Sequence, residues 1–516
     1  MKKIIPLLFL FCFSRTFAQV PEDALRYSWY PQNGSARYMA IGGAMGSLGG
    51  DISAVDVNPA GIGFYKTSEF VFSPGLFLNK NKADYRQTIT DQKRNAFQFG
   101  PMGVIWGSVE ENKPTNSHAY AVSVNELANF RNQVHYGGLN NYSSFAEQFA
   151  EEFARSGYSI NEILNTNSAL PYTSALAVYT YLIDTVTVNG QTIVKAAPEW
   201  QLDSGYAIKQ DMFKTTGGGL YDLSFSAAYN KKDKLLYGLT LGIPVVYYKS
   251  HTVFTEEDTS SNINNKFRSF TYDDDFTTSG VGFNVKIGAI YKPTEYIRLG
   301  LAIHTPTYMF LSDERSSTLS TYTELNGQEY HESAKSSDFA SDGPGNAKYR
   351  QTAPWKAILS ASFVIREIEN VKKQRGFLTA DIEYVNHRGS RFKGDNDPVT
   401  DVEKAYYKEL NKVVKEQYKG TFNFRVGGEL KFNIIMARLG FAYYSNPYKD
   451  KALKASQMLL SGGLGYRNKG FFADLTYVHR VIKDVNFPYR LSDRANTFAT
   501  IDQKQGNIVA TIGFKF

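Results

Sequence analysis

Two arginines in the last quarter of the chain, Arg425 and Arg438, have the type and spacing to bind an anionic ligand. Each lies on the polar side of a segment in which polar and apolar residues alternate, and a tight turn near Asn433-Ile434 joins the two segments. Two adjacent guanidinium groups would suit a carboxylate, which accepts paired hydrogen bonds from arginine. Because Glu429 shares the polar side with Arg425, a structural ion pair is the alternative interpretation.

Catalytic motifs are absent from the sequence. Its seven histidines are scattered, with no His-Glu-x-x-His pair for a metal and no Gly-x-Ser-x-Gly for a nucleophilic serine. The glycine-rich stretch Ser35–Phe64 contains no lysine, so it lacks the phosphate-binding lysine of a nucleotide loop. We therefore expect no enzyme, no cofactor and no metal site. A barrel phospholipase or protease is the enzymatic alternative.

The N-terminus has the order of a secretory signal peptide. Met1-Lys2-Lys3 precedes an apolar run from Ile4 to Phe13, and Ala18 offers a small residue for cleavage. A run of about ten apolar residues is too short to span a bilayer as a helix. The single cysteine, Cys12, lies within this segment, so we expect a mature chain with neither disulfides nor cysteine-bound metal.

Composition excludes some protein classes. The net charge of +7 is mild and dispersed, which does not fit a nucleic-acid-binding protein. The chain is rich in aromatic residues and glycine, with 35 Tyr, 36 Phe and 42 Gly, yet nothing after residue 18 resembles a 20-residue apolar helix. A membrane protein of this composition would therefore have to be a β-barrel.

Residues alternate most clearly between Thr421 and Phe432. Phenylalanine, valine and leucine side chains fall on one face of this segment, whereas Asn423, Arg425 and Glu429 fall on the other. Alternation with a period of two indicates a β-strand. A strand of a soluble β-sandwich would give the same pattern, so only the whole set of strands separates the two classes.

Fourteen segments have this strand-like character. They are residues 69–79, 95–107, 117–127, 220–230, 235–247, 280–291, 295–304, 356–366, 376–386, 421–432, 435–444, 456–466, 470–480 and 506–516. Short connections alternate with long ones such as 128–219, 248–279 and 305–355, as in outer-membrane barrels. We predict an all-β fold, a 14-stranded antiparallel transmembrane barrel, in the outer membrane of a Gram-negative bacterium.

The N-terminal region resembles the FadL/TodX family of outer-membrane transporters for hydrophobic compounds. The family pattern is an Ala-Arg, a glycine-rich stretch, an Asp-x-Ser-Ala and an Asn-Pro-Ala-Gly. This chain has Ala36-Arg37, the glycines from Gly42 to Gly50, Asp51-Ile52-Ser53-Ala54, and Asn58-Pro59-Ala60-Gly61. The resemblance covers the N-terminal region and the strands but not the long loops.

The resemblance implies three regions. Residues 1–18 would be the signal peptide, 19–68 a hatch folded inside the barrel, and 69–516 the barrel. The hatch would include Asn58, Pro59, Ala60 and Gly61, and glycines would let it turn sharply against the barrel wall. Phe516 ends an aromatic-rich last strand, by which the barrel-assembly machinery would recognise the protein.

The family mechanism is uptake of a hydrophobic ligand, such as a long-chain fatty acid, from the outer surface to a pocket beside the hatch. Release is sideways into the membrane lipids through a kinked third strand. In this chain the alternation of that strand fails at Asn125 and Glu126, which marks either the kink or the start of the outer loop. Phe145, Phe149 and Phe153, four residues apart, would form one face of a helix, either as loop core or as an outer capture surface.

Two further functions remain open from the sequence. Some relatives serve as accessory or docking barrels in protein secretion, and others have been described as haem receptors. The sequence does not identify the ligand.

Overall fold

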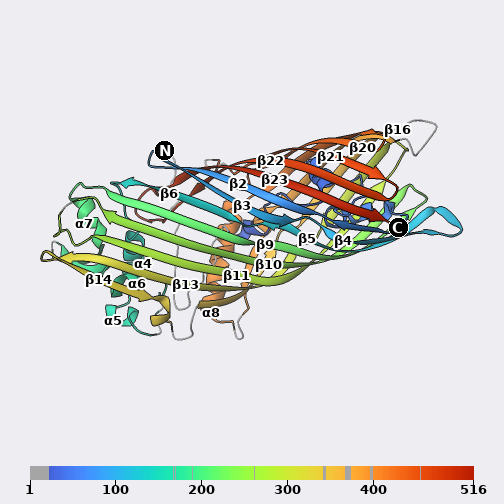
Figure 1. Cartoon of the computed structure of the whole chain (residues 1–516). Helices are drawn as coiled ribbons and strands as arrows, with labels where there is room; N and C mark the ends of the chain where they lie inside the picture. Colours follow the sequence, from blue (N-terminus) through green and yellow to red (C-terminus); the bar gives the residue numbers. More distant parts are fainter. Residues whose placement is uncertain are drawn as a thin grey trace, which may run out of the picture.

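The computed structural model describes residues 23–516 except 167, 169, 189, 261, 341–344, 367–373, 396–398, 452 and 454. The predicted signal peptide lies outside the described residues. The chain forms a long barrel with a helical cap at one end, and the C-terminus lies at the other end (Figure 1). Tight turns such as that at Lys232-Asp233 join the strands at the end without the cap, where both turn residues have positive φ. We call this the periplasmic end, and the capped end the outer end.

The barrel is closed by fourteen antiparallel strand spans, which confirms the predicted fold class. The last strand, β23, closes the barrel by pairing with both β1 and β2, which make up the first span. In chain order the spans are β1 (Glu69–Phe72) with β2 (Pro74–Tyr85); β3 (Thr88–Phe99) with β4 (Met102–Glu110); β5 (Lys113–Asn129) with β6 (Asn132–Asn140); β9 (Ile208–Lys231); β10 (Leu235–Asp258); β11 (Ser269–Tyr291); β12 (Ile297–His304) with β13 (Thr307–Leu325); β15 (Gly345–Ala353) with β16 (Lys356–Arg366); β17 (Gln374–Asn386) with β18 (Arg391–Gly394); β19 (Gly420–Phe432); β20 (Ile435–Tyr444); β21 (Gln457–Asn468); β22 (Phe471–Asn486); and β23 (Ala499–Lys515).

The strands expose apolar side chains and bury polar ones. On β19, Phe424 and Val426 are 47% and 48% exposed, whereas Arg425 between them is 3% exposed. A soluble sandwich would bury the phenylalanine and valine and leave the arginine in water. The outward faces of the barrel therefore match lipid, and the inward faces line a polar lumen.

Several strands extend far beyond the predicted ranges at the outer end. The prediction that residues 248–279 form a loop is wrong, because β10 continues to Asp258 and β11 begins at Ser269. The first two outward residues of β10 beyond Tyr247 are polar, Lys249 and then His251. This face is surrounded by water, so the apolar alternation stops while the backbone ladder continues. The expected loops 128–219 and 305–355 likewise contain β6, the outer part of β9, β13 and β15.

The outer cap is built from the long connections. Its elements are α4 (Glu147–Ser156), α5 (Ile160–Ile163), α6 (Ser174–Tyr179), β7 (Ile183–Val188), β8 (Gln191–Ala196), α7 (Ala197–Asp203), β14 (Gln328–Lys335) and η2 (Ser336–Asp338). The connection between β17 and β19 forms η3 (His387–Gly389) and α8 (Asp401–Gln417), and α8 lies nearer the middle of the barrel (Figure 1), where its buried face packs with residues of the N-terminal segment. A buried cluster of aromatic and aliphatic side chains joins the cap to the outer ends of the strands. Among the described residues, no helix is both long and apolar enough to cross a membrane.

The N-terminal segment, Asp23–Phe64, packs inside the barrel. It contains α1 (Asp23–Arg26), α2 (Ala36–Ala40), α3 (Ala54–Val57) and η1 (Pro59–Phe64), and the first barrel strand begins at Glu69. Glycines let its turns approach the wall: Gly42 has φ +65°, and a Cβ there would lie 2.7 Å from the Phe441 carbonyl oxygen. An L-residue with a side chain would meet both the φ restriction and the wall.

Candidate functional site

Asn58 attaches the N-terminal segment to the wall. Its side-chain amide donates to the backbone carbonyls of Gly46 at 2.6 Å and Ala289 at 3.2 Å. Its Oδ1 accepts from the Ala60 N–H at the start of η1. Asn58, Pro59, Ala60 and Gly61 are all buried and line neither of the lumen cavities described below. The Asn-Pro-Ala-Gly motif thus forms a structural contact between segment and barrel.

A buried charge cluster ties the same segment to two strands. Lys286 on β11 lies 2.7 Å from Asp56 Oδ1 and 2.6 Å from Asp222 Oδ2 on β9. Asp56 Oδ2 also accepts a hydrogen bond from Asn125 at 2.9 Å. Each of the three charged side chains is 6% exposed or less, so the ion pairs are shielded from water. Sequence reasoning missed Lys286, although a lysine between Val285 and Ile287 is a signal of an inward-facing charge.

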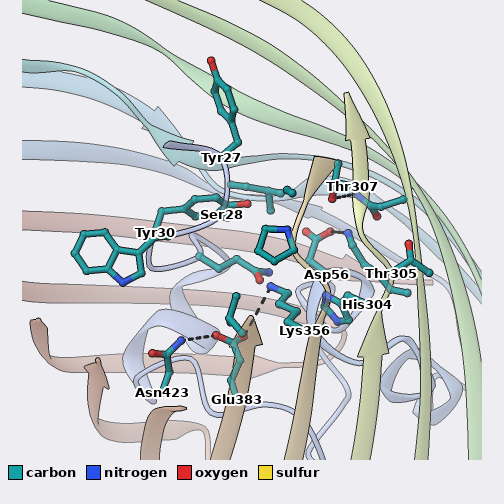
Figure 2. A pocket seen from close by; sticks show the side chains of 18 of the residues that line it. Tyr27, Ser28, Tyr30, Asp56, His304, Thr305, Thr307, Lys356, Glu383 and Asn423 are labelled. Atoms are coloured by element: carbon teal, nitrogen blue, oxygen red, sulfur yellow. Dashed lines mark hydrogen bonds and ion pairs between the residues drawn. The ribbon is translucent and has the colours of Figure 1, made fainter. Parts of the chain in front are cut away.

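A small cavity of about 80 Å³ lies in the lumen, and Asp56 and Lys286 of this cluster form part of its lining (Figure 2). We call it the lumen cavity. Its lining combines aromatic side chains of the N-terminal segment with charged and polar side chains of the wall: Tyr27, Trp29, Tyr30, Asp56, Lys286, His304, Lys356, Glu383, Asn423 and Arg425. The His304 ring hydrogen-bonds the Val57 carbonyl at 2.9 Å, which fixes the ring against the N-terminal segment. The lining therefore offers both aromatic and charged groups to a ligand.

Arg425 belongs to the lumen cavity and Arg438 does not. Arg425 Nη2 donates to Glu383 Oε2 at 3.0 Å, and Figure 2 shows Lys356 pointing toward the same carboxylate. Lys356 Nζ is 3.8 Å from Glu383 Oε2, beyond hydrogen-bonding distance. Lys356 and Arg425 thus form a positively charged end of the cavity around the single carboxylate of Glu383. Sequence reasoning also missed Lys356 and Glu383.

The predicted pair of adjacent arginines is corrected by the strand register. Arg425 lies opposite Ala442, whereas Arg438 lies opposite Glu429, four positions further along β19. Arg438 Nε donates to Glu429 Oε2 at 2.6 Å, and its Nη1 donates to Asp474 Oδ1 at 2.5 Å. Arg37 of the N-terminal segment lies 3.7 Å from the same Glu429. Arg438 therefore belongs to a structural network of ion pairs, which was the alternative to ligand binding.

A second small cavity of about 70 Å³ lies beside the first. We call it the side cavity. Tyr30 and Leu127 line both cavities, so the two are separated by these side chains. Burial raises the pKa of Tyr30, so its phenol is neutral at physiological pH. The other residues around the side cavity include Asn33, Phe77 and Asn129.

The wall next to the side cavity contains a break in strand pairing, which we call the seam. β3 pairs with β2, and β6 pairs with β9, but the described residues of β3 and β6 form no backbone ladder with each other. Side chains bridge them instead: Gln133 donates to Gln92 at 3.1 Å, and Arg94 donates to the Asn132 carbonyl at 3.1 Å.

Glu126 lies at the inner end of the seam. The register of β5 with β9 shifts between Glu126 and Ala128, and Glu126 and Asn125 are both 1% exposed. The Glu126 carboxylate accepts from the Phe99 N–H at 2.9 Å, at the residue where β3 leaves the ladder. Asn33 donates to the Phe99 carbonyl at 2.9 Å and thereby places the N-terminal segment against the same point. The irregularity suspected from the sequence lies at this point, and its role as an exit stays a prediction.

The aromatic stripe of the outer cap is buried. Phe145, Phe149 and Phe153 are 6%, 2% and 5% exposed, and the Phe145 ring stacks on Phe254 with centroids 4.4 Å apart. The nearby Glu147 lies 3.1 Å from Arg494, yet burial raises the pKa of its carboxyl to about 7. The rings form the core of the cap, and their role in ligand capture stays a prediction.

A closed barrel, an N-terminal segment within it, and lumen cavities beside an unpaired seam together characterise the fold of this chain. Solved structures with a similar fold are known. A Pseudomonas aeruginosa FadL homologue is 12% identical with a TM-score of 0.53, covering 95% of this chain and 99% of that chain. The P. putida toluene transporter TodX is 11% identical with a TM-score of 0.51, covering 94% and 99%. The resemblance to the FadL/TodX family is thereby confirmed at the level of the fold. No model of a protein family matches the sequence, and no curated protein is similar to it.

Proposed function

We propose that the protein is an outer-membrane channel for the uptake of hydrophobic small molecules that leave sideways through the seam. The observation that carries this proposal is the side cavity, whose lining includes Leu127 and Ala128 at the shift in the β5 register, beside the residue where β3 ends. An apolar molecule in this cavity has a short path to lipid, because Phe97 and Phe99 at the edge of β3 are 73% and 51% exposed on the outward face.

The ligand in this proposal is an amphiphile with a carboxylate, such as a long-chain fatty acid. Lys356 and Arg425 share a single carboxylate, Glu383, within the lumen cavity. A ligand carboxylate there would add hydrogen bonds to ionised donors, which are stronger than neutral ones. Its chain would lie against Trp29, Tyr30 and Leu127.

The N-terminal segment is the hatch of this channel. It fills the lumen below the cavities, and Tyr30 stands between the lumen cavity and the side cavity. A displacement of Tyr30 would join the two cavities into one path from the outer surface to the seam. The Phe145 stripe would take part only if the cap opens, since its rings are now buried.

A cross-link across the seam tests the exit. The only cysteine, Cys12, lies in the predicted signal peptide, so a double variant Gln92→Cys/Gln133→Cys would carry the only two thiols of the mature protein. Bridging them with a short bifunctional thiol reagent should reduce uptake of a fluorescent fatty acid to the level of cells without the protein. Reduction of a cleavable bridge should restore uptake.

The control uses a position where strands are already paired. Lys249 and Thr277 lie directly opposite on β10 and β11, so Lys249→Cys/Thr277→Cys carries a bridge that leaves the seam free. Uptake should continue in the bridged control. Full uptake through a bridged seam would exclude the sideways exit, and loss in both variants would place the block elsewhere.

A further inference from the structure

Three lysines form a row on the outward face of the barrel, next to the seam. Lys80 on β2 lies directly opposite Lys93 on β3, and also directly opposite Lys504 on β23. All three side chains are exposed. Residues directly opposite on antiparallel strands have Cβ atoms about 5 Å apart, and like charges at such positions destabilise the sheet. The row therefore needs a source of negative charge.

The neighbouring row on the outer side shows how the same strands balance their charges. There Lys82 lies opposite Asp91 on one side and Asp502 on the other. Asp502 in turn lies opposite Lys483 on β22. Charge alternates along the whole of this second row. The lysine row is different, because lysine follows lysine across three strands.

Little within the protein compensates the lysine row. Lys80 lies 3.3 Å from Asp91, diagonally across the ladder. Lys93 and Lys504 have no ion pair within 4.0 Å to any described residue. Asp91 is also next to Lys82, so one carboxylate is shared between two lysines. The row keeps a surplus of positive charge on an outward-facing surface.

The row lies at the outer edge of the lipid-facing belt. On β23, Phe514 at the periplasmic end and Lys504 are ten residues apart. At about 3.3 Å per residue and a strand tilt of about 40°, this is roughly 25 Å along the membrane normal, the height of the apolar band. The next outward row toward the membrane has Leu78 between Asn95 and Gly506. In the row after it, Leu76 lies opposite Phe97, and the two are 41% and 73% exposed.

We propose that this row binds the phosphate groups of an outer-leaflet glycolipid of the lipopolysaccharide class. Its position matches the height of such head groups, and its charge is complementary to phosphate. The apolar surface around Leu76 and Phe97 lies two rows nearer the middle of the membrane and receives the acyl chains. A soluble anion would use the charge but not this apolar continuation, so the lipid is the occupant that fits both parts of the surface.

The test compares two variants that lose the same charge, two lysines each, from neighbouring rows on the same outward face of the barrel. Lys93→Gln/Lys504→Gln removes two lysines from the proposed site, and Lys82→Gln/Lys483→Gln removes two from the balanced row. Each is purified in mild detergent, checked for the mobility shift on boiling that marks a folded barrel, and titrated with bisphosphorylated lipid A under native mass spectrometry. The site variant should bind roughly tenfold more weakly, since each basic residue near an anionic lipid contributes to binding, while the control changes little.

Two further probes separate lipid from free anion. Dephosphorylated lipid A should bind the wild-type protein as weakly as bisphosphorylated lipid A binds the site variant. Inorganic phosphate alone should show no saturable binding. Equal losses in the two variants, unchanged binding in the site variant, or binding of free phosphate as tight as that of the lipid would each overturn the proposal.

Discussion

Replacing Lys286 with methionine should loosen the N-terminal segment from the barrel wall. The Lys286 ammonium is the shared partner of Asp56 and Asp222, at 2.7 Å and 2.6 Å, and all three side chains are almost fully buried. Methionine keeps most of the side-chain volume but leaves two carboxylates without their cation. Removing one partner of a buried ion pair costs about 3–5 kcal/mol, because the remaining charge is uncompensated.

The loss should appear as local opening and not as collapse of the barrel. Asp56 belongs to α3 of the N-terminal segment, whereas the strand ladders of β9 and β11 do not depend on the lysine side chain. A cost of this size raises the population of the detached segment by roughly two to four orders of magnitude, since about 1.4 kcal/mol is a factor of ten. Hydrogen–deuterium exchange of peptides covering residues 51–57, measured by mass spectrometry, should accelerate accordingly, with strand peptides unchanged.

A compensated variant serves as the control. Lys286→Met combined with Asp56→Asn and Asp222→Asn contains no buried charge at this position and should recover most of the protection. Replacement of a whole buried ion cluster by neutral groups is often close to neutral in stability. The reasoning fails if the single variant exchanges as slowly as the wild type, or if the triple variant is no better protected than the single one.

Other predictions concern the hatch, the arginines and the cap. Deleting residues 32–63 should raise single-channel conductance in planar bilayers, because the segment fills the lumen; unchanged conductance would show that it does not block the path. Asn58→Ala should cost about 1–3 kcal/mol of segment stability by leaving buried carbonyls unpaired, measurable as faster local hydrogen exchange. Arg425→Gln should weaken binding of a fatty acid by about 1–3 kcal/mol but leave an uncharged hydrocarbon unaffected, while Arg438→Gln should lower barrel stability and alter neither ligand; equal effects of the two substitutions on binding would contradict the placement of Arg425 alone in the cavity. The pKa of Glu147, raised to about 7, means that the folded cap takes up a proton that the unfolded chain releases near its ordinary pKa, so cap stability should fall as pH rises from about 4.5 to about 7. Hydrogen exchange of α4, corrected for intrinsic rates, should therefore be slower at pH 5 than at pH 8, and Glu147→Gln should reduce the difference.

The sequence by itself determined the barrel and its number of strands. Arg425 points inward between Phe424 and Val426, which point outward. This arrangement is a local property of the strand, because successive side chains point to opposite faces. The lipid around the barrel imposes this alternation on every spanning strand, so the pattern can be read segment by segment. Beyond Tyr247, β10 is surrounded by water instead of lipid. The same reasoning failed there, because it predicted the end of the strand too early.

The sequence left register only partly open. The two-residue turn at Asn433-Ile434 pairs Phe432 with Ile435 and therefore Glu429 with Arg438, so the expected pair of adjacent arginines was wrong about a register that the turn implies. Pairing between strands far apart in the chain could not be predicted in this way. The row of Lys80, Lys93 and Lys504 exists only because β23 closes the barrel onto β2. The lumen cavity likewise collects side chains from the N-terminal segment and from strands hundreds of residues away. Side-chain alternation depends on each strand alone, whereas register and cavities depend on the closed sheet.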